Sequence, residues 1–354
     1  MRIEFEPMSL RTRHEFRIAR AASVPVRTSF WVRIADEEGR KGWGEAAVTT
    51  AYYGETAGTA AAVLPTLAEV VAEASEGDPF ALERIDLVLA RAIGGHAATK
   101  AGISSALHDL VAKRLGVPVW RLWGLDPVAP SSSFTIALDQ IERMRERVRE
   151  AASYPILKVK VGTPQDEEVL RMIRDEAPQK MVRVDANTGW TASQALKALP
   201  MLEDFAVELI EQPLHPGDTE GMRALARASR IPLVADESCR AATDIPSLVG
   251  AFDVINIKLA KCGSLREAVR MVHCARAHHL QVMLGCMIES TLGISAAVQL
   301  APLVDYVDLD GAALLSDDPF RGPGIGPDGE VRFNREPGLG VTRGGDAAGD
   351  ASGD

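Results

Sequence analysis

The chain has 354 residues, of which 46% are hydrophobic and 25% charged, and its formal net charge is −10. This is the composition of an ordinary globular protein, and the length predicts about two domains. The acidic balance, without blocks of Lys and Arg, excludes the electrostatic footprint of a nucleic-acid binder and favours a small polar substrate.

The amino terminus, Met1–Glu6, lacks the apolar core of a signal peptide, and no apolar run approaches the length of a membrane span. We therefore expect a cytoplasmic protein without a membrane partner. Its four cysteines lie far apart and form no C-x-x-C pair, which favours reduced thiols over a zinc site or a disulfide framework.

Residues 1–124 follow an α+β pattern. Strand-like stretches such as Phe30–Ile34, with a turn at Asp36–Gly39, predict an antiparallel sheet. Helices are predicted near residues 55–75, 79–93 and 96–115. Strands followed by helices indicate a domain separate from the rest of the chain.

Residues 125–311 alternate between strand and helix. Five short, apolar, β-branched runs, spaced 22 to 26 residues apart, end in Lys160, Asp185, Glu211, Asp236 and Lys258. Helical periodicity over 139–152 and the N-cap candidates Thr163, Thr191 and Ser264 predict helices between the strands. With Thr135, Gly285 and Asp308 the strand ends number eight, which suits a closed (β/α) barrel. No G-x-G-x-x-G motif supports a dinucleotide site.

The strand ends of such a barrel converge on one mouth, where active sites lie. Three acids on neighbouring strands, Asp185, Glu211 and Asp236, offer oxygen ligands to Mg²⁺, with Mn²⁺ as the alternative. Lys160 and Lys258, on the second and sixth strands, face each other across the ring. This arrangement suits removal of a proton next to a carboxylate on one face and its return on the other, which is racemisation or epimerisation.

Lys158 points to the same side of its strand as Lys160, and a neighbouring cation lowers the pKa of a lysine. Simpler interpretations exist for each motif alone. A single Asp at a strand end is more often a turn residue or a helix cap, and Lys-x-Lys occurs on solvated strands. The joint pattern in barrel order favours the active-site interpretation.

The sequence closely resembles the enolase superfamily, in the subgroup that includes muconate lactonising enzymes, over about residues 1–340. The resemblance rests on the motifs Gly42–Glu45, Tyr53–Glu55, Lys158–Lys160, Asp185–Asn187, Glu211–Pro213, Asp236–Ser238 and Asn256–Lys258. It implies a modified (β/α)8-type barrel, (β/α)7β, over residues 125–311. It also implies an α+β capping domain over 1–124, completed by about 312–341. The Gly-, Ala- and Asp-rich residues 342–354 are expected to form a disordered tail.

The resemblance also implies site roles. It implies one Mg²⁺ per subunit, held by Asp185, Glu211 and Asp236, in a homo-oligomer. Lys160 is then the base for the (R) centre and Lys258 for the (S) centre, while Lys158 stabilises the enediolate, as in a superfamily known for lysine bases acting with Mg²⁺. Asn187 and Asn256 are expected to support the metal ligands.

The eighth strand narrows the substrate class. Asp308 and Asp310 are expected to lie on one side of the strand, where two carboxylates suit an ammonium group across the mouth from a carboxylate-binding metal. The motif resembles that of dipeptide epimerases, of which the L-Ala-D/L-Glu epimerases of peptidoglycan turnover are the best known group. The expected reaction inverts the α-carbon of the C-terminal residue of a dipeptide, such as L-Ala-L-Glu, by two-base proton transfer through an Mg²⁺-stabilised enediolate.

Further resemblance places Thr135, Cys286 and Ile288 beside the substrate. It also implies an arginine from a capping-domain loop, for which Arg20 is chosen over Arg17 and Arg27. Glu289 instead favours a cationic side chain by direct pairing, so the preference for the second residue stays open.

Two other functions remain open. One is an o-succinylbenzoate synthase, N-acylamino acid racemase or cycloisomerase of the same subgroup, in which no ammonium has to be bound. The other is a catalytically silent dipeptide-binding barrel. The presence of all three acids and both opposed lysines argues against the silent barrel.

Overall fold

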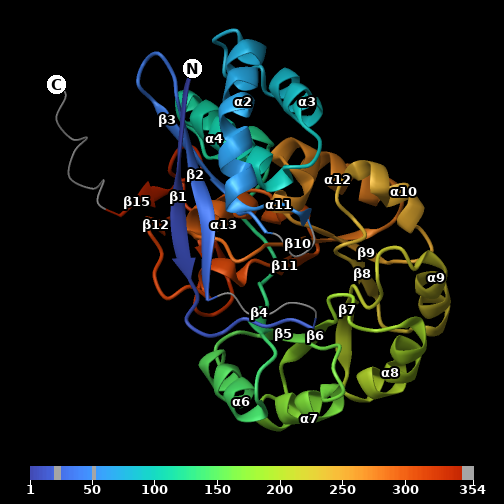
Figure 1. The fold of residues 1–354 in the computed structure, drawn as a ribbon. Coiled ribbons are helices and arrows are strands. Elements are labelled where there is room, and N and C mark those ends of the chain that lie inside the picture. The colour runs from blue at the N-terminus through green and yellow to red at the C-terminus, as the bar shows by residue number, and fades with distance from the viewer. Residues whose placement is uncertain (20–24, 50–52, 345–354) are drawn as a thin grey trace.

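The N-terminal part of the protein is an antiparallel sheet covered by helices. The computed structural model describes residues 1–19, 25–49 and 53–344. Strands β1 (Arg2–Arg11), β2 (Val26–Ala35) and β3 (Lys41–Ala46) lie in that order, beside helices α2 (Ala57–Ser75), α3 (Leu82–Ala92), α4 (Ala97–Leu115) and α5 (Val119–Leu122). The predicted turn joins β2 to β3, where Asp36 Oδ1 accepts hydrogen bonds from the N–H groups of Glu38 and Arg40. This confirms the α+β prediction (Figure 1).

Two glycines of β3 let this strand lie directly on α4. A Cβ on Gly42 would lie 2.0 Å from the carbonyl oxygen of Ala106, and one on Gly44 would lie 2.0 Å from that of Gly102. Glycine alone permits this approach of two backbones. The motif Gly42–Glu45 is therefore a packing element that holds the sheet against a helix buried along most of its length.

The second part is the predicted parallel barrel. Its eight strands pair in chain order: β4 (Phe134–Ile136), β5 (Ile156–Lys160), β6 (Met181–Asp185), β7 (Val207–Glu211), β8 (Leu233–Ala235), β9 (Val254–Ile257), β10 (Gln281–Gly285) and β11 (Tyr306–Asp308). The ring closes where the N–H of Ser133, just before β4, donates to the carbonyl oxygen of Val307 on β11 at 3.2 Å. The fold class and the presence of all eight predicted strands are confirmed, although the last strand ends at Asp308 and does not extend to Asp310.

Helices alternate with the strands and cover the barrel. They are α6 (Ile141–Glu150), α7 (Asp166–Glu176), α8 (Ala192–Asp204), α9 (Thr219–Ala228), α10 (Ile245–Leu248), α11 (Leu259–Cys262), α12 (Leu265–Ala277) and α13 (Thr291–Val298), with short 3₁₀ turns η1 (Ala242–Asp244), η2 (Ala301–Leu303) and η3 (Asp310–Ala312). Thr191 and Ser264 are N-caps as predicted. The N-cap prediction for Thr163 is wrong, because the carboxylate of Asp166 binds the N–H of Thr163 and α7 begins only at Asp166.

The chain after the barrel returns to both parts. Its strands are β12 (Phe320–Arg321), β13 (Gly324–Ile325), β14 (Val331–Arg332) and β15 (Thr342–Arg343). The N–H of Leu339 donates to Asp109 Oδ1 on α4 at 2.6 Å, which ties this segment to the capping domain. Because β15 pairs with β12, the prediction of a disordered tail from residue 342 is wrong for Thr342 and Arg343. The rest of that prediction, residues 345–354, lies outside the described residues.

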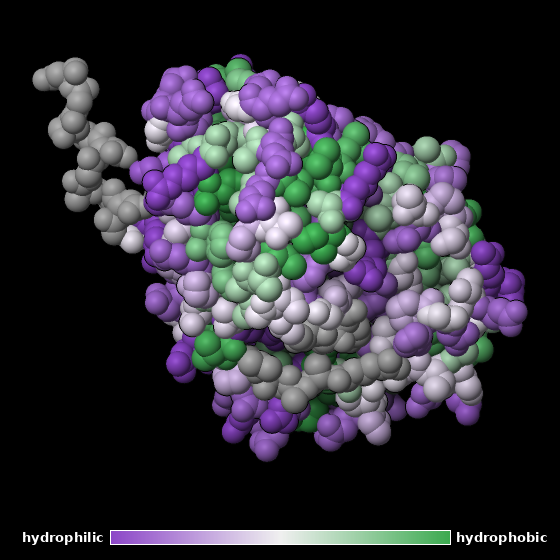
Figure 2. Space-filling model, turned by 45° about the horizontal axis from the view of Figure 1, so that its top comes forward, coloured by the Kyte–Doolittle hydropathy of each residue, from purple (hydrophilic) through white to green (hydrophobic). Residues whose placement is uncertain are grey.

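Helix α2 departs from one expectation. The sequence analysis expected no apolar run as long as a membrane span. Among the described residues, however, this helix alone is long and apolar enough to cross a membrane by length and composition. Its residues Ala60, Leu64, Leu67 and Val71 recur at helical spacing and pack in the core of the capping domain. Figure 2 turns this domain towards the viewer and shows apolar side chains interspersed with polar ones.

Candidate active site

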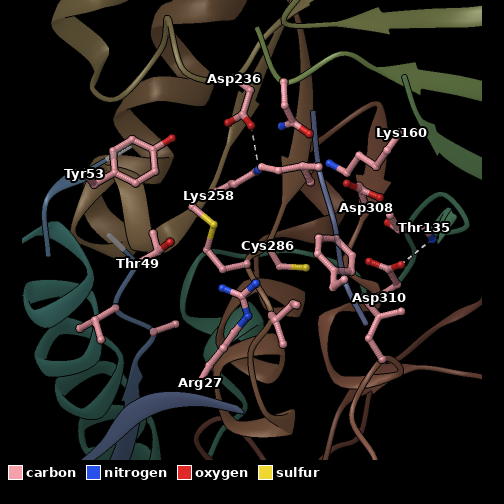
Figure 3. A pocket seen from close by; sticks show the side chains of 18 of the residues that line it. Arg27, Thr49, Tyr53, Thr135, Lys160, Asp236, Lys258, Cys286, Asp308 and Asp310 are labelled. Carbon is pink, nitrogen blue, oxygen red and sulfur yellow. Dashed lines mark hydrogen bonds and ion pairs between the residues drawn. The ribbon is translucent and has the colours of Figure 1, made fainter. Parts of the chain in front are cut away.

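A cavity of about 270 Å³ lies at the carboxyl ends of the barrel strands, and the capping domain forms part of its wall. The barrel contributes Thr135, Lys158, Lys160, Asn187, Asp236, Glu237, Lys258, Cys286, Ile288, Asp308 and Asp310 to its wall. The capping domain contributes residues of β2 and of the segments after β1 and β3. Figure 3 shows these side chains converging from different elements on one space.

The three predicted acids end adjacent strands and are buried. Asp185 and Glu211 pair in register at the ends of β6 and β7, and Asp236 follows β8 directly. Lys160 Nζ lies 2.7 Å from Asp185 Oδ2, and Lys258 Nζ lies 2.8 Å from Asp236 Oδ2. The two lysines come from β5 and from the residue after β9, four strands apart in the ring of eight, as predicted.

Lys158 lies at the centre of this carboxylate group. Its Nζ is 2.7 Å from Glu211 Oε2, 2.7 Å from Asp308 Oδ2 and 3.1 Å from Asp185 Oδ2. Burial alone would lower the pKa of Lys158, but Asp308, Glu211 and Asp185 raise it well above its ordinary value. Burial likewise lowers the pKa of Lys258, but the negative charge of Asp236 outweighs this effect and the pKa is raised well above its ordinary value. The ammonium groups of Lys158 and Lys258 thus neutralise part of the negative charge of the buried carboxylates.

Lys261 is a site residue that the sequence analysis missed. Its buried ammonium donates to the carboxylate and the carbonyl oxygen of Asp236, both at 2.6 Å, and to the carbonyl oxygens of Cys239 and Asn256. It therefore fixes the rotamer of Asp236. The spacing Lys258-x-x-Lys261, one helical turn after a strand end, was the signal that could have revealed it.

The three acids suit a hard cation by their chemistry, although their present contacts are with lysines. Among the described residues, no three acidic, His or Cys side chains surround a single point closely enough to hold a metal ion. Burial, followed by the charge of Asp185, raises the pKa of Glu211, and a cation would relieve that repulsion. Asn256 Nδ2 donates to Glu211 Oε1 at 2.8 Å, and the N–H of Asn187 donates to Asp185 Oδ1 at 2.9 Å. All-oxygen ligands of this kind fit Mg²⁺.

Asp308 and Asp310 both reach the cavity, but not in the predicted manner. Strand β11 ends at Asp308, and Asp310 belongs to the 3₁₀ turn that follows, so they are not neighbours on one face of a strand. Ser133 and Lys158 bind Asp308, while Asp310 Oδ2 accepts the N–H of Thr135 at 2.6 Å. Burial and the charge of Asp308 raise the pKa of Asp310 to about 6.

Glu237 and Tyr53 also line the cavity and were not predicted as site residues. Burial, then the charges of Asp236 and Asp185, raises the pKa of Glu237 to about 8. Asn187 Nδ2 donates to Glu237 Oε1 at 3.4 Å, so this side-chain amide contacts the residue that follows the predicted ligand Asp236. The motifs Asp236–Ser238 and Tyr53–Glu55 contained both residues, but nothing in the sequence distinguished them from solvated positions.

The prediction that Arg20 is the capping-domain arginine beside the substrate stays a prediction. Arg20 lies outside the described residues. Arg17 pairs with Glu15 at the surface, whereas Arg27 on β2 lines the cavity. Glu289 is buried beside the cavity wall, accepts the N–H of Met287, and is absent from the lining. Direct pairing of Glu289 with a substrate cation therefore has no support in this geometry.

Family comparisons agree with the fold. Residues 7–124 match the mandelate racemase / muconate lactonizing enzyme N-terminal domain, and residues 140–347 match the enolase C-terminal domain-like family. The chain is 39% identical over 347 residues to an L-Ala-D/L-Glu epimerase of Bacteroides thetaiotaomicron, covering 97% of this chain and 88% of the relative. A hydrophobic dipeptide epimerase of a Flavobacteria bacterium is 34% identical over 331 residues, covering 91% and 93%.

Solved structures are similar over the same length. The L-Ala-D/L-Glu epimerase from Bacillus subtilis, in a substrate-liganded complex, has a TM-score of 0.91 at 28% identity and covers 97% of this chain and 98% of its own. A dipeptide epimerase from Enterococcus faecalis, complexed with Mg and the dipeptide L-Leu-L-Tyr, has a TM-score of 0.90 at 30% identity, with 96% and 99% covered.

Proposed function

From the premise that this chain belongs to the mandelate racemase / muconate lactonizing enzyme family, we propose that it is a dipeptide epimerase. It inverts the α-carbon of the C-terminal residue of a dipeptide. The observation that carries the proposal is the placement of Lys160 and Lys258 on opposite sides of one cavity, with the three acids between them and Asp308 and Asp310 on the wall. Relatives across the whole length are named dipeptide epimerases.

The two lysines would exchange one proton across the substrate. One lysine, as a neutral amine, takes the proton from the α-carbon, and the electron pair of the broken C–H bond moves into the carboxylate to form an enediolate. The opposite lysine, as an ammonium, returns a proton to the other face of that carbon. We assign Lys160 to the (R) centre and Lys258 to the (S) centre. After each turnover the lysine that was neutral is therefore protonated, and the opposite lysine is neutral.

The neighbouring carboxylates must be neutralised before a lysine can act as a base. In their present contacts Asp236 and its neighbours raise the pKa of Lys258, which favours the inactive ammonium form. Asp185, Glu211 and Asp236 would hold one Mg²⁺, with Mn²⁺ as the alternative. When bound, the ion supplies positive charge that stabilises the developing enediolate. Lys158, held between Asp308 and Glu211, adds a fixed positive charge on the same side.

The ammonium group of the dipeptide would bind at Asp308 and Asp310. Both carboxylates are buried and line the cavity, and Asp310 is fixed by the N–H of Thr135. Asp308 already pairs with Lys158, whereas Asp310 makes no ion pair among the described residues, so a substrate ammonium would supply the cationic partner that a buried carboxylate needs. A lyase or cycloisomerase of the same family acts on substrates without that group, so for it the two acids would have no ligand.

Proton exchange in D₂O tests this function directly. The protein with Mg²⁺ is incubated with a dipeptide library, and NMR follows loss of the α-proton signal of the second residue together with formation of the opposite epimer. We expect Lys160→Ala and Lys258→Ala each to abolish epimerisation, while each retains exchange of one epimer only. Lys197→Ala, which removes an exposed lysine of α8, is the matched control.

Two outcomes would contradict the proposal. Absence of exchange with every dipeptide would exclude an epimerase. Activity on a substrate without an ammonium, unaffected by Asp308→Asn, would indicate a lyase or cycloisomerase of the same family instead.

A further inference from the structure

Each of the three acids at the barrel mouth has one carboxylate oxygen bound by a donor of the barrel itself. The bonds run from the N–H of Asn187 to Asp185 Oδ1 at 2.9 Å, from Nδ2 of Asn256 to Glu211 Oε1 at 2.8 Å, and from Nζ of Lys261 to Asp236 Oδ1 at 2.6 Å. All three donor residues are buried. One oxygen of each acid is therefore already engaged by the protein.

The second oxygen of each acid contacts a lysine of the cavity. These contacts are Lys160 Nζ to Asp185 Oδ2 at 2.7 Å, Lys158 Nζ to Glu211 Oε2 at 2.7 Å and Lys258 Nζ to Asp236 Oδ2 at 2.8 Å. The three lysines line the cavity, whereas Lys261 does not. Each acid thus presents one oxygen to the lysines of the cavity while its other oxygen is held by a separate donor.

Lys261 is the most constrained of these donors. Its ammonium lies within hydrogen-bond distance of four oxygens at 2.6 to 3.0 Å, which are Asp236 Oδ1 and the carbonyl oxygens of Asp236, Cys239 and Asn256. Its side chain has no exposed surface. Rotation of the Asp236 carboxylate would leave a buried ammonium without the carboxylate that it pairs with, which is costly. Asp236 Oδ1 is therefore not free to turn towards the cavity.

The number of oxygens that a carboxylate offers distinguishes two hard cations. Ca²⁺ takes about six to eight oxygen ligands and accepts both oxygens of one carboxylate, whereas Mg²⁺ requires a tight octahedron and keeps several waters. Acids that offer one oxygen each suit Mg²⁺ and withhold the bidentate contacts that favour Ca²⁺. Charge alone cannot make this distinction, because both ions are divalent.

We propose that the donors on the three acids make the site select Mg²⁺ over Ca²⁺, and that Lys261 is the positioning residue that does this for Asp236. The inference rests on the proposed function, in which these acids hold the metal. Lys261 does not line the cavity and acts through Asp236. Asn256 acts in the same way on Glu211 without carrying a charge.

Calorimetric titration of the full-length protein with MgCl₂ or CaCl₂, after removal of bound metal with EDTA, tests the proposal. Wild type should bind Mg²⁺ more tightly than Ca²⁺. In Lys261→Met the ratio of the Ca²⁺ to the Mg²⁺ dissociation constant should fall about 10- to 100-fold, the range in which partners of metal ligands act. The ratio is the readout because loss of a nearby positive charge strengthens the binding of both divalent ions alike. Asn256→Leu frees Glu211 Oε1 without a change of charge and should lower the ratio too.

Lys180→Met is the matched control. It removes another lysine held by carbonyl oxygens, those of Ala151 and Ala152, just before β6 and at the opposite end of that strand from Asp185. Both dissociation constants should stay unchanged in this variant. If circular dichroism shows that Lys261→Met does not fold, Asn256→Leu alone decides by the same ratio.

Two results would overturn the inference: a ratio that is unchanged in Lys261→Met and Asn256→Leu, or tighter binding of Ca²⁺ than of Mg²⁺ by wild type. A wild type that binds neither ion would instead overturn the proposed metal site, and with it the proposed function.

Discussion

The lysines and acids of the cavity form one network of buried charges. Lys158 alone contacts three carboxylates, and Lys261 binds both the backbone and the side chain of Asp236. Removing either member of a buried ion pair leaves the other without a partner, which costs several kcal/mol. Single substitutions here therefore change stability as well as activity, and activity data need a melting temperature beside them.

Protonation of Asp310 should appear as an acid limb in the pH profile of activity. Because burial and Asp308 raise its pKa to about 6, Asp310 becomes neutral as the pH falls through that value and can no longer balance a substrate ammonium. We expect kcat/KM for a dipeptide, at saturating Mg²⁺, to decrease below about pH 6, since this parameter reports the free enzyme.

Asp310→Asn should have a low kcat/KM that lacks this limb. Asp317→Asn, at an exposed position after η3, is the control and should keep the wild-type profile. An unchanged acid limb in Asp310→Asn would assign it to another group.

At the level of elements, the contact of β3 with α4 sets how closely the capping sheet lies on its own helix layer. The sheet bears Arg27 on β2 and Glu45 on β3, and its distance from α4 depends on the absence of side chains at Gly42 and Gly44. A strand pushed outward here would shift β2, with which β3 pairs, and the residues after β3 that line the cavity.

We expect Gly44→Ala to destabilise the protein by at least about 1–3 kcal/mol, the usual effect of forcing an extra methyl group into a packed contact. The new Cβ would lie 2.0 Å from a backbone oxygen of α4, which cannot move independently of its helix. Urea unfolding measures the change. Gly94→Ala, where a Cβ meets nothing within 4 Å, should be close to neutral, and equal effects of the two substitutions would contradict this account.

For the molecule as a whole, Glu45 joins the capping domain to the barrel. Its carboxylate accepts the N–H groups of Ser290 and Gly293 at the start of α13, 245 and 248 residues away in sequence, and the hydroxyl of Ser29. Burial, followed by the charge of Glu289, raises the pKa of Glu45 to about 8, while burial raises that of Glu289 to about 7. The contact between the two parts therefore depends on protonation.

This contact predicts how stability varies with pH. The folded protein binds a proton at Glu45 that the unfolded chain releases near pH 4.5, so its contribution is complete below that pH and is lost as the pH rises through about 8. We expect the melting temperature to fall over this range. In Glu45→Gln, which cannot ionise, the fall should be smaller, whereas Glu69→Gln, at an exposed site on α2, should match wild type. Parallel pH curves for Glu45→Gln and wild type would contradict this assignment.

Strand alternation and N-cap chemistry are local rules, and they were enough to predict the eight barrel strands, the order of Lys160, Asp185, Glu211, Asp236 and Lys258, and most of the helices. They failed where a single side chain overrides the pattern. Asp166 delays the start of α7, and the strand that was expected to continue to Asp310 ends at Asp308, where a 3₁₀ turn begins.

Contacts between distant segments required the tertiary structure. The sequence shows three arginines near the capping loop without indicating which one meets the cavity, because that depends on how β2 lies over the barrel mouth. The sequence likewise does not show that Lys261 holds Asp236, or that Glu289, expected to pair with a substrate cation, is absent from the cavity lining. The reacting groups follow from strand spacing, which is local. Which capping residues line the cavity follows from packing between two domains, where partners can lie more than 100 residues apart.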